Sequence, residues 1–514
     1  MKRRILKKGV RFLFVFLAML IFFTTSYVSS QFRSVGFEQL LYTIIRSEGT
    51  SITAILEGIL FVSIATIVSI VFVYIFAKKT KKYFQNELYF KLSIKNKDFK
   101  FKILPISLNK SLVISFLFFV FTVLMGLHII DFFDYVSKVL NKTTLYEEKY
   151  VEPRDVKINF PKNKQNLIYI FVESLEATSI SKENGGAFDE TVISELEDLA
   201  LDNISFSNSD KLGGAYALDG NSWTIAAMIG QTSGIPFRVP LSVANDYSGY
   251  GESVPGAYSI GEILADNGYK NYLMLGSDAN FGGRKDYFTY HGNYEIYDYY
   301  YALENEWIPS DYLEWWGFED KKLFEFAKEK LLEISENDEP FNFTMLTADT
   351  HFGDGYQDET CDVNFESKYA NSFDCSSKMI YEFIKWIKKQ DFYKNTTIVI
   401  VGDHLTMQED FYSEIDDDYQ RGVYNVFINS KNKNTDYLKN REFTTMDMYP
   451  TTLAALGCEI EGDRLALGTN LFSGKKTLAE QLGKDELNNE LQMSSFFYDE
   501  TILGDSYYKI KEND

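Results

Sequence analysis

Cysteine is scarce in this chain. Its 514 residues include only three cysteines, and because no two of them stand in a CxxC pair, a cysteine-based zinc module is excluded. Two of the three, Cys361 and Cys375, close a short loop and could pair as a disulfide in an oxidising compartment. Cys458 lies in the apolar stretch "LAALGCEI", which favours a buried thiol.

Positive charge is also scarce over most of the chain. Beyond residue 140 there are 33 Lys and Arg against 66 Asp and Glu, and this acidic balance argues against nucleic acid as a partner. The first 140 residues reverse the balance, with 19 basic residues against 7 acidic ones. A basic, apolar front and an acidic body indicate a membrane anchor joined to a soluble domain.

Three apolar stretches are long enough to cross a bilayer. They lie at about residues 12–29, 53–77 and 111–130 and define an expected membrane anchor over residues 1–131. Lys and Arg crowd the segment before the first stretch and the loop at 78–110, so the positive-inside rule places both in the cytoplasm and everything after about residue 132 outside. A cleaved signal peptide is the alternative for the first stretch, but two further spans favour an uncleaved anchor.

Beyond a polar connector at 132–163, short apolar runs alternate with amphipathic segments. The pattern predicts strands at 166–174, 271–276, 341–349, 396–403 and 423–430. It predicts helices at 192–201, 223–230, 259–267, 320–335, 370–389 and 447–456. Such alternation is typical of an α/β domain with a mainly parallel sheet, which we expect over residues 164–475, followed by a polar tail at 476–514.

The stretch "IVIVGDHLTM" ends one of these strands on two polar residues, Asp403 and His404. In open α/β sheets the chemistry lies just past the carboxyl ends of the strands, and adjacent carboxylate and imidazole groups suit a divalent metal. The alternative is a capping Asp beside a surface His, so the pair by itself does not decide between the two interpretations.

Two more residues stand at similar places. The apolar run "LIYIFV" ends on Glu173, and a buried strand that ends on a carboxylate usually pairs it or binds a metal with it. Thr224 falls in the first turn of the expected helix "WTIAAMIG", at the end of the helix dipole that attracts anions. The alternatives are a Glu at a helix N-terminus and an ordinary N-cap supplied by Ser222 or Thr224.

In order and in local sequence, these residues resemble a known family. The chain is similar to the phosphoglycerol transferases of the alkaline phosphatase and sulfatase superfamily, which include lipoteichoic acid synthases and enzymes that add phosphoglycerol to periplasmic glucans. The resemblance covers roughly residues 160–475 and rests on the pieces "NLIYIFVESLE", "SWTIAAMIGQTSGIPF", "TADTHFGDGY" and "VIVGDHLTM". The second piece and "DTHFGDG" look closest to the glucan-modifying branch.

The resemblance implies an alkaline phosphatase-like and sulfatase-like α/β fold with a mainly parallel sheet flanked by helices. It also implies that Glu173, Thr224, Asp403 and His404 bind one divalent metal, Mn²⁺ first, with Mg²⁺ or Zn²⁺ as alternatives. Thr224 would take phosphoglycerol from phosphatidylglycerol as a covalent ester, because metal coordination activates a hydroxyl that is otherwise a poor nucleophile. The acceptor would be a glycan or a growing polyglycerolphosphate chain outside the cytoplasm.

Two further positions are expected to hold the phosphate or headgroup. His351, in "DTHFGDG", matches the family's headgroup-binding histidine. Arg284, in "NFGGRKDYF", offers a guanidinium suited to bidentate phosphate contact. The chain departs from the lipoteichoic acid branch here, because Gly282 and Gly283 stand where that branch has bulkier residues, so the headgroup contacts are left open.

Rival functions differ in what they need from the sequence. A sulfatase needs Cys or Ser in a C/S-x-P/A-x-R context, which "NSWTIAAM" does not provide, so sulfatase or phosphodiesterase activity is the weaker alternative. Phosphoethanolamine transfer to lipid A or a glycan also uses a metal-bound threonine and stays open as the main alternative. A non-catalytic receptor would be expected to lack at least one metal ligand, and all four are present.

Overall fold

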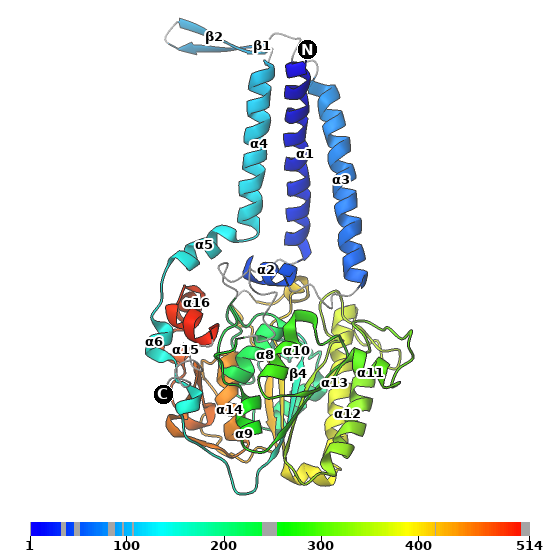
Figure 1. The fold of residues 1–514 in the computed structure, drawn as a ribbon, viewed down its shortest axis with the longest axis vertical. Coiled ribbons are helices and arrows are strands. Elements are labelled where there is room, and N and C mark those ends of the chain that lie inside the picture. The colour runs from blue at the N-terminus through cyan, green and yellow to red at the C-terminus, as the bar shows by residue number, and fades with distance from the viewer. Residues whose placement is uncertain are drawn as a thin grey trace. The chain divides into compact units, whose positions relative to one another are not determined.

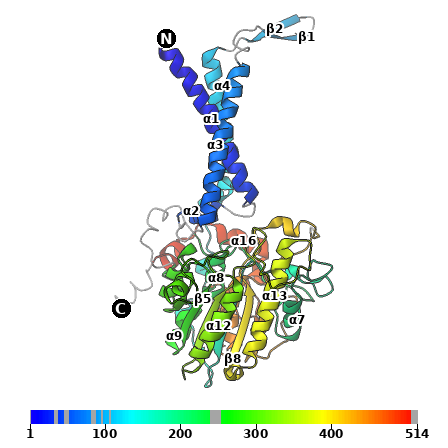
Figure 2. The same ribbon diagram turned by 90° about the vertical axis from the view of Figure 1, so that its right-hand side faces the viewer.

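The computed structural model describes residues 2–31, 37–45, 52–80, 88–94, 97–104, 107–238, 254–416 and 418–504. The chain forms two compact units (Figures 1 and 2). The smaller unit takes Met1–Phe37 and Thr50–Val136, and the larger takes Glu38–Gly49 and Ser137–Asp514. Each unit is described separately below.

Long apolar helices dominate the smaller unit. They are α1 (Lys2–Gln31), α3 (Ile52–Thr80) and α4 (Leu108–Ile129), and they run side by side in Figure 1. In the described residues, three segments are long and apolar enough to cross a membrane: Ile5–Ser29, Gly58–Lys79 and Leu108–Ile129. The three stretches expected from the sequence are therefore helical. The unit also contains the antiparallel hairpin β1 (Leu88–Ile94) and β2 (Lys97–Leu104).

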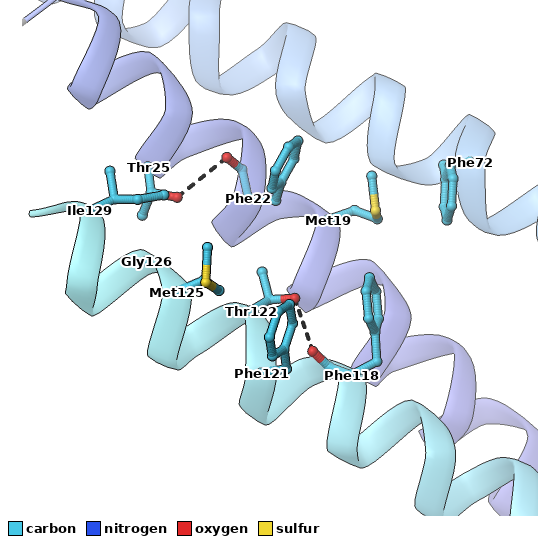
Figure 3. A pocket seen from close by; sticks show the side chains of 10 residues that line it. All are labelled: Met19, Phe22, Thr25, Phe72, Phe118, Phe121, Thr122, Met125, Gly126 and Ile129. Atoms are coloured by element: carbon cyan, nitrogen blue, oxygen red, sulfur yellow. Dashed lines mark hydrogen bonds between the residues drawn. The ribbon is translucent and has the colours of Figure 1, made fainter.

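Helices α1 and α4 approach closely at Gly126, where an added Cβ would stand 3.0 Å from Thr25 Cγ2. Small residues permit such close packing between membrane helices. An apolar cavity of about 310 Å³ lies beside this contact (Figure 3). The Thr25 and Thr122 hydroxyls donate to carbonyl oxygens of their own helices, Thr25 to Ile21 at 2.7 Å and Thr122 to Phe118 at 2.9 Å. Both hydroxyl groups are thus satisfied, so threonine adds no unpaired donor to the apolar lining.

The larger unit is built on a six-stranded sheet in the order β6-β5-β7-β4-β8-β9. The strands are β4 (Asn166–Val172), β5 (Lys270–Leu275), β6 (Glu295–Tyr297), β7 (Phe341–Leu346), β8 (Thr396–Gly402) and β9 (Asn425–Ile428). All neighbours are parallel except β9, which pairs antiparallel with β8. The mainly parallel α/β sheet expected from the sequence is confirmed, and β6 is an additional edge strand.

Helices cover both faces of this sheet. On one face α7 (Ser194–Asp202), α12 (Asp320–Ser335) and α13 (Lys368–Ile387) share a core with Ile168, Ile170 and Val172 of β4. The other face is covered by α8 (Thr224–Ser233), α9 (Ile260–Asp266) and α14 (Met448–Ala455), which share a core with Leu167, Tyr169 and Phe171. Figure 2 shows α12 and α13 side by side over their face. Because alternate residues of a strand point to opposite faces, a run that is apolar throughout produces this three-layer arrangement.

Shorter elements complete the unit. They are α2 (Phe37–Ile45), α5 (Phe132–Leu140, which begins in the smaller unit), α6 (Leu145–Lys149), α10 (Arg284–Tyr290), α11 (Tyr299–Glu304), α15 (Leu478–Leu482), α16 (Lys484–Gln492), β3 (Ile158–Asn159), β10 (Glu459–Ile460), β11 (Arg464–Leu465) and β12 (Gly468–Thr469). Strand β3 pairs with β10, and β11 pairs with β12. Tyr146 of α6 and Leu487 and Leu491 of α16 are buried in the core, so parts of the expected connector and tail pack into the larger unit.

The three cysteines have distinct surroundings. Cys361 and Cys375 lie 14 residues apart and form a disulfide that ties the chain after β7 to α13. Cys458 is a buried free thiol, as its apolar surroundings in the sequence suggested.

Candidate functional site

The candidate site lies where β4 and β8 end. These strands are parallel neighbours, and Val172 stands opposite Gly402 in their register. The next residue on β4 is Glu173 and the next on β8 is Asp403, so two carboxylates follow adjacent strands at the same level. The backbone N–H of Asp403 donates to the Val172 carbonyl oxygen at 3.2 Å, which continues the ladder into the site.

Glu173, Asp403 and His404 form a compact, buried group. One ligand atom of each lies within 4.8 Å of the others. His404 Nε2 is 3.4 Å from Glu173 Oε1 and 3.4 Å from Asp403 Oδ2. Glu173 is 3% exposed, while Asp403 and His404 are fully buried, so solvent does not satisfy these groups.

Thr224 brings a hydroxyl to the same place from the start of α8. It is the first residue of α8, and Trp223 occupies the N-cap position. The ordinary N-cap that Ser222 or Thr224 could have supplied is therefore not what this helix uses. The Thr224 hydroxyl is 3.3 Å from Glu173 Oε2 and 3.5 Å from His404 Nε2. It stands at the positive end of the helix dipole, which favours anions.

Backbone groups hold the orientation of Asp403. Its Oδ1 accepts hydrogen bonds from the N–H groups of Ser174 and His404, both at 2.7 Å. Its other oxygen, Oδ2, is buried and forms no hydrogen bond with the described residues, although His404 Nε2 lies 3.4 Å from it. Leaving a buried carboxylate oxygen without a partner costs free energy, so this atom marks a place for a positively charged ligand.

A similar contact orients His404. Its Nδ1 lies 2.8 Å from the Leu405 carbonyl oxygen, which can only accept, so Nδ1 carries the hydrogen. In the neutral ring Nε2 is then left with its lone pair facing Glu173 and Asp403. Ser174 donates its hydroxyl to Glu173 Oε1 at 2.8 Å and has a positive φ of 57°, a strained conformation of the kind found at functional sites. These contacts are typical of residues that position metal ligands.

The charges of the group are strongly coupled. Burial raises the pKa of Asp403, and the neighbouring Glu173 raises it further, to about 7. Burial opposes a charge on His404, but Asp403 and Glu173 outweigh it and raise the pKa of the ring to about 10. Burial also opposes a charge on Glu173, yet His404 lowers the pKa of that carboxyl to about 2. Two buried carboxylates against one imidazole thus attract positive charge.

The residues present fit a divalent cation. Two carboxylates, one imidazole nitrogen with a free lone pair and one hydroxyl converge on a single point, and the Asp403 oxygen aimed at it is unpaired. Mixed oxygen and nitrogen ligands suit ions such as Mn²⁺, Mg²⁺ and Zn²⁺. The group Glu173, Asp403 and His404 could therefore hold a metal ion, with Thr224 beside it.

Arg284 and His351 lie near this group without bonding to it directly. Arg284 is buried and donates from Nη2 to the Asp278 carbonyl oxygen at 2.8 Å, while its Nε has no acceptor within the described part of the chain. Burial lowers the pKa of Arg284 to about 10, against the opposing effect of Glu173 and other nearby carboxylates. A buried guanidinium with an unused donor is suited to an anionic ligand.

Two glycines set the start of the helix that carries Arg284. Gly282 and Gly283 adopt left-handed conformations, with φ of 67° and 73°. A side chain is disfavoured in this region, which gives these two positions a structural reason to be glycine. The difference from the lipoteichoic acid branch at Gly282 and Gly283 therefore reflects a local turn before α10.

His351 follows β7 on a loop beside Trp316, whose ring centroid is 4.7 Å from that of the imidazole. Its Nδ1 is 3.2 Å from the Phe352 carbonyl oxygen, so the neutral ring presents Nε2 as an acceptor. Burial lowers the pKa of His351, whereas the Glu173 carboxylate opposes this shift. The imidazole is therefore close enough to the group of Glu173, Asp403 and His404 to interact with it electrostatically.

Sequence reasoning missed several residues that support the group. Gln231, on α8, donates to the carbonyl oxygens of Gly402 and Asp403 at 3.0 and 3.2 Å and so links the helix of Thr224 to the end of β8. Thr347 accepts from the Glu173 N–H at 3.1 Å, and Thr350 donates to the Glu173 carbonyl oxygen. The only available signal was that these residues lie within the stretches "MIGQTSG" and "TADTH".

A second buried acidic pair lies under the His351 loop. Asp320 accepts from the N–H groups of Ala348 and Asp349 at 2.8 and 3.0 Å, and the Asp320 N–H donates to Asp349 Oδ1 at 3.2 Å. Burial raises the pKa of Asp320 to about 7. Burial and the neighbouring Asp320 raise the pKa of Asp349 as well. The two carboxyls hold the loop to the start of α12.

Part of the chain that forms this site matches a known protein family. The family model described as Sulfatase matches residues 224–458, a range that contains Thr224, Arg284, His351, Asp403 and His404. These residues form a sulfatase-family domain. Glu173 precedes the matched range, but it follows β4, which lies in the centre of the same sheet.

The chain is also similar to curated proteins. Phosphoglycerol transferase I of Escherichia fergusonii is 31% identical over 336 residues, which cover 63% of this chain and 41% of the relative. The chain thus spans less than half the length of the curated relatives it matches. Among solved structures, the lipoteichoic acid synthase LtaP from Listeria monocytogenes is 18% identical with a TM-score of 0.47 and covers 62% of this chain and 79% of its own. The Streptococcus pyogenes phosphoglycerol transferase GacH is 14% identical with a TM-score of 0.42, over 71% and 98% of the two chains.

Proposed function

We propose that this protein is a membrane-anchored, metal-dependent transferase that moves phosphoglycerol from phosphatidylglycerol to an acceptor outside the cytoplasm. The observation that carries the proposal is the position of the Thr224 hydroxyl at the start of α8, 3.3 Å from Glu173 and 3.5 Å from His404. A hydroxyl at a helix N-terminus beside a cation-attracting group has both requirements of a phosphoryl-accepting nucleophile. The name shared by the curated relatives supports phosphoglycerol as the group transferred.

The metal would be held by Glu173, Asp403 and His404, together with Thr224, and Mn²⁺ is the first candidate, followed by Mg²⁺ and Zn²⁺. When bound, such an ion supplies positive charge that favours the ionised hydroxyl and offsets charge on the phosphoryl oxygens. The carbonyl oxygen of Leu405 keeps His404 in the tautomer that this role requires, and the N–H groups of Ser174 and His404 hold Asp403 in place.

The reaction has two displacements at phosphorus. In the first, Thr224 Oγ1 forms a bond to the phosphorus of the donor, and the bond from phosphorus to the diacylglycerol oxygen breaks. The proton lost by Thr224 balances the proton gained by the departing diacylglycerol. In the second, a hydroxyl oxygen of the acceptor attacks the same phosphorus, the bond to Thr224 breaks, and Thr224 recovers a proton as the acceptor loses one.

Arg284 and His351 are assigned to holding the phosphoglycerol group. Arg284 has a buried Nε–H without an acceptor in the described residues, and a guanidinium can meet a phosphate with two parallel hydrogen bonds. His351 carries its hydrogen on Nδ1, so its Nε2 can accept from a glycerol hydroxyl. Both side chains are near enough to Glu173 to act on a group attached to Thr224.

The donor lipid and the location follow from the membrane helices. Three described segments could cross a membrane, and a lipid donor is available only to a protein at the bilayer. Because Lys and Arg crowd the two proposed cytoplasmic segments, the sulfatase-family domain is assigned to the outer side of the cell membrane. The acceptor is then a glycan or a polyglycerolphosphate chain of the envelope.

The covalent step gives the direct test. The purified full chain, mixed with Mn²⁺ and phosphatidylglycerol micelles but no acceptor, should gain the mass of one phosphoglycerol group on Thr224, because the second displacement has no substrate. Thr224→Ala should abolish the adduct and the release of diacylglycerol, whereas the neighbouring Ser222→Ala serves as the control that retains both. An adduct that persists in Thr224→Ala would overturn the assignment of the nucleophile. An adduct formed from phosphatidylethanolamine in place of phosphatidylglycerol would identify a phosphoethanolamine transferase.

A further inference from the structure

A pocket of about 280 Å³ lies in the sulfatase-family domain, outside the group formed by Glu173, Asp403 and His404. Four chain segments form it: residues 216–218, Leu405, residues 419–421 and the first turns of α16. Its lining residues are Tyr216, Ala217, Leu218, Leu405, Tyr419, Gln420, Arg421, Lys484, Asp485 and Asn488. Its volume is near the lower end of the range of small-molecule sites, about 300–1,000 Å³, and so suits a single small ring.

Two segments of the backbone connect the lining of the pocket to His404 and Thr224. Leu405 directly follows His404, and its carbonyl oxygen accepts the hydrogen bond that orients the His404 ring. Residues 216–218 belong to the loop that leads into Thr224, and this loop is paired to the chain before β9, with Ala215 N–H donating to Val423 at 3.0 Å. A molecule in the pocket therefore lies at the same edge of the sheet as Thr224.

Hydrogen bonds hold the walls of the pocket in place. Asn488 and Asp219 exchange two hydrogen bonds, of 2.8 and 2.7 Å, that tie α16 to the loop before Thr224. Lys484 donates to Gln420 Oε1 at 2.6 Å, and its ammonium lies 5.0 Å from the centroid of the Tyr216 ring. The pocket is thus preorganised by contacts among its own lining residues.

The lining has two cations and one carboxylate, and the charges balance once Glu176, the partner of Arg421 outside the lining, is counted. Arg421 forms a two-point ion pair with the buried carboxylate of Glu176. The remaining cation, Lys484, stands on the same helical turn as the carboxylate of Asp485. The Asp485 carboxylate would repel a polyanionic ligand, and no net positive charge around the pocket offsets this repulsion. The lining therefore favours a neutral ligand.

The side chains match the chemistry of a sugar. Tyr419 offers aromatic surface for the C–H groups of a pyranose ring, whereas the buried Tyr216 ring is covered by Lys484. The amide nitrogen of Gln420 and the carboxylate of Asp485 offer donors and an acceptor for its hydroxyls, whereas the Asn488 amide is engaged with Asp219. Resting on the proposed function, we infer that this pocket binds a neutral sugar of the acceptor glycan and presents one of its hydroxyls to the phosphoglycerol group on Thr224.

The test measures binding directly and does not depend on turnover. A neutral β-glucan oligosaccharide is titrated into the full chain, loaded with Mn²⁺, and the dissociation constant is measured by calorimetry. Tyr419→Ala and Asp485→Ala should each weaken the binding by at least about fivefold, since each removes one contact to the ring or its hydroxyls. Tyr419→Phe keeps the ring and should bind nearly as tightly as the wild type.

Glu486→Ala is the matched control, because Glu486 is an exposed carboxylate next to Asp485 that does not line the pocket. Asp485 is itself exposed, so Asp485→Asn provides a second variant that changes the charge with little effect on folding. Equal affinity in wild type, Tyr419→Ala and both Asp485 variants would overturn the inference, and so would a failure of the oligosaccharide to bind. Binding of polyglycerolphosphate in its place would overturn it in favour of an anionic acceptor. The Thr224 adduct is measured on the same preparations, so a failed transferase proposal is recognised independently of the sugar-binding result.

Discussion

The hydroxyl of Thr224 lies 3.3 Å from Oε2 of Glu173, although the two residues are 51 positions apart in the chain. Glu173 is fixed by the end of a central strand, and Thr224 by the first turn of a helix on one face of the sheet. The contact therefore depends on how α8 packs on β4. Gln231 strengthens this arrangement, because it joins the same helix to the backbone of Gly402 and Asp403.

Thr224→Ser tests how much the position of this hydroxyl matters. The variant keeps the nucleophilic oxygen but loses the γ-methyl group that restricts its rotamer. We expect the rate of diacylglycerol release from phosphatidylglycerol to fall by about one to two orders of magnitude, because small misplacements of reacting atoms are costly. Initial rates with a labelled lipid measure this. A wild-type rate in Thr224→Ser would show that the methyl group does not position the oxygen.

Replacement of the proposed metal ligands should abolish metal binding. His404→Ala and Asp403→Ala each delete a ligand atom that the surrounding hydrogen bonds hold in place, and the affinity for Mn²⁺ should fall by more than about 100-fold. Metal analysis of the purified full chain after dialysis checks this. Glu486→Ala is the control for loss of an exposed carboxylate. One bound ion per chain in both ligand variants would show that the metal, if present, is held elsewhere.

Arg284→Lys should impair recognition of the donor even though the charge is kept. Lysine lacks the planar fork of donors that a guanidinium offers to a phosphate. The KM for phosphatidylglycerol should rise by about tenfold in Arg284→Lys and further in Arg284→Ala, measured from the rate of diacylglycerol release. The exposed neighbour Lys285→Ala is the matched control. An unchanged KM in both Arg284 variants would remove this residue from the headgroup contacts.

The acidic pair under the His351 loop predicts a pH-dependent stability. An aspartate in an unfolded chain ionises near pH 4, whereas burial raises the pKa of Asp320 to about 7 in the folded protein. Between these values the folded state binds more protons than the unfolded one, so stability falls as the pH rises from about 4 to 7. Asp349→Asn removes one carboxyl of the pair and should stabilise the protein at pH 8 by about 1–3 kcal/mol.

This advantage should shrink as the pH is lowered toward 5, because the wild-type pair then regains a proton. Urea unfolding of the full chain at pH 8, 6.5 and 5 measures the difference. Asp362→Asn, which changes an exposed aspartate near the same loop, should behave as the wild type at every pH. A stability difference between Asp349→Asn and the wild type that is equal at all three pH values would show that the pair has no raised pKa in this range.

The proposed topology predicts which part of the chain is accessible from outside. Protease added to intact spheroplasts should digest the domain beyond residue 137 and spare the basic loop at 78–110, because the positive-inside rule places that loop in the cytoplasm. Full protection of the domain from protease would show that the orientation is reversed.

Alkylation under denaturing, non-reducing conditions should modify one cysteine of three, since Cys361 and Cys375 are paired.

The sequence alone determined the features that depend on neighbouring residues. Continuous apolar runs identified the central strands β4 and β8, because a strand covered on both faces has no polar side. Polar residues directly after those runs made Glu173, Asp403 and His404 candidates, and the first turn of an apolar helix made Thr224 one, but only the resemblance to phosphoglycerol transferases grouped the four as one predicted site. The three long apolar segments of the smaller unit were equally plain, because the length of a membrane span is set by the bilayer.

Only the tertiary structure decided what depends on contacts between distant segments. The register of Val172 opposite Gly402 brings the strand ends level, and the Leu405 carbonyl sets the His404 tautomer, yet neither leaves a mark in the local pattern. Leu487 and Leu491 of α16 pack into the core although the segment reads as a polar tail. The buried pair of Asp320 and Asp349 and the pocket beside Leu405 also come from separate stretches of chain. Periodicity reports which side of an element is buried, but the identity of the neighbour across the interface is fixed only when the elements pack together.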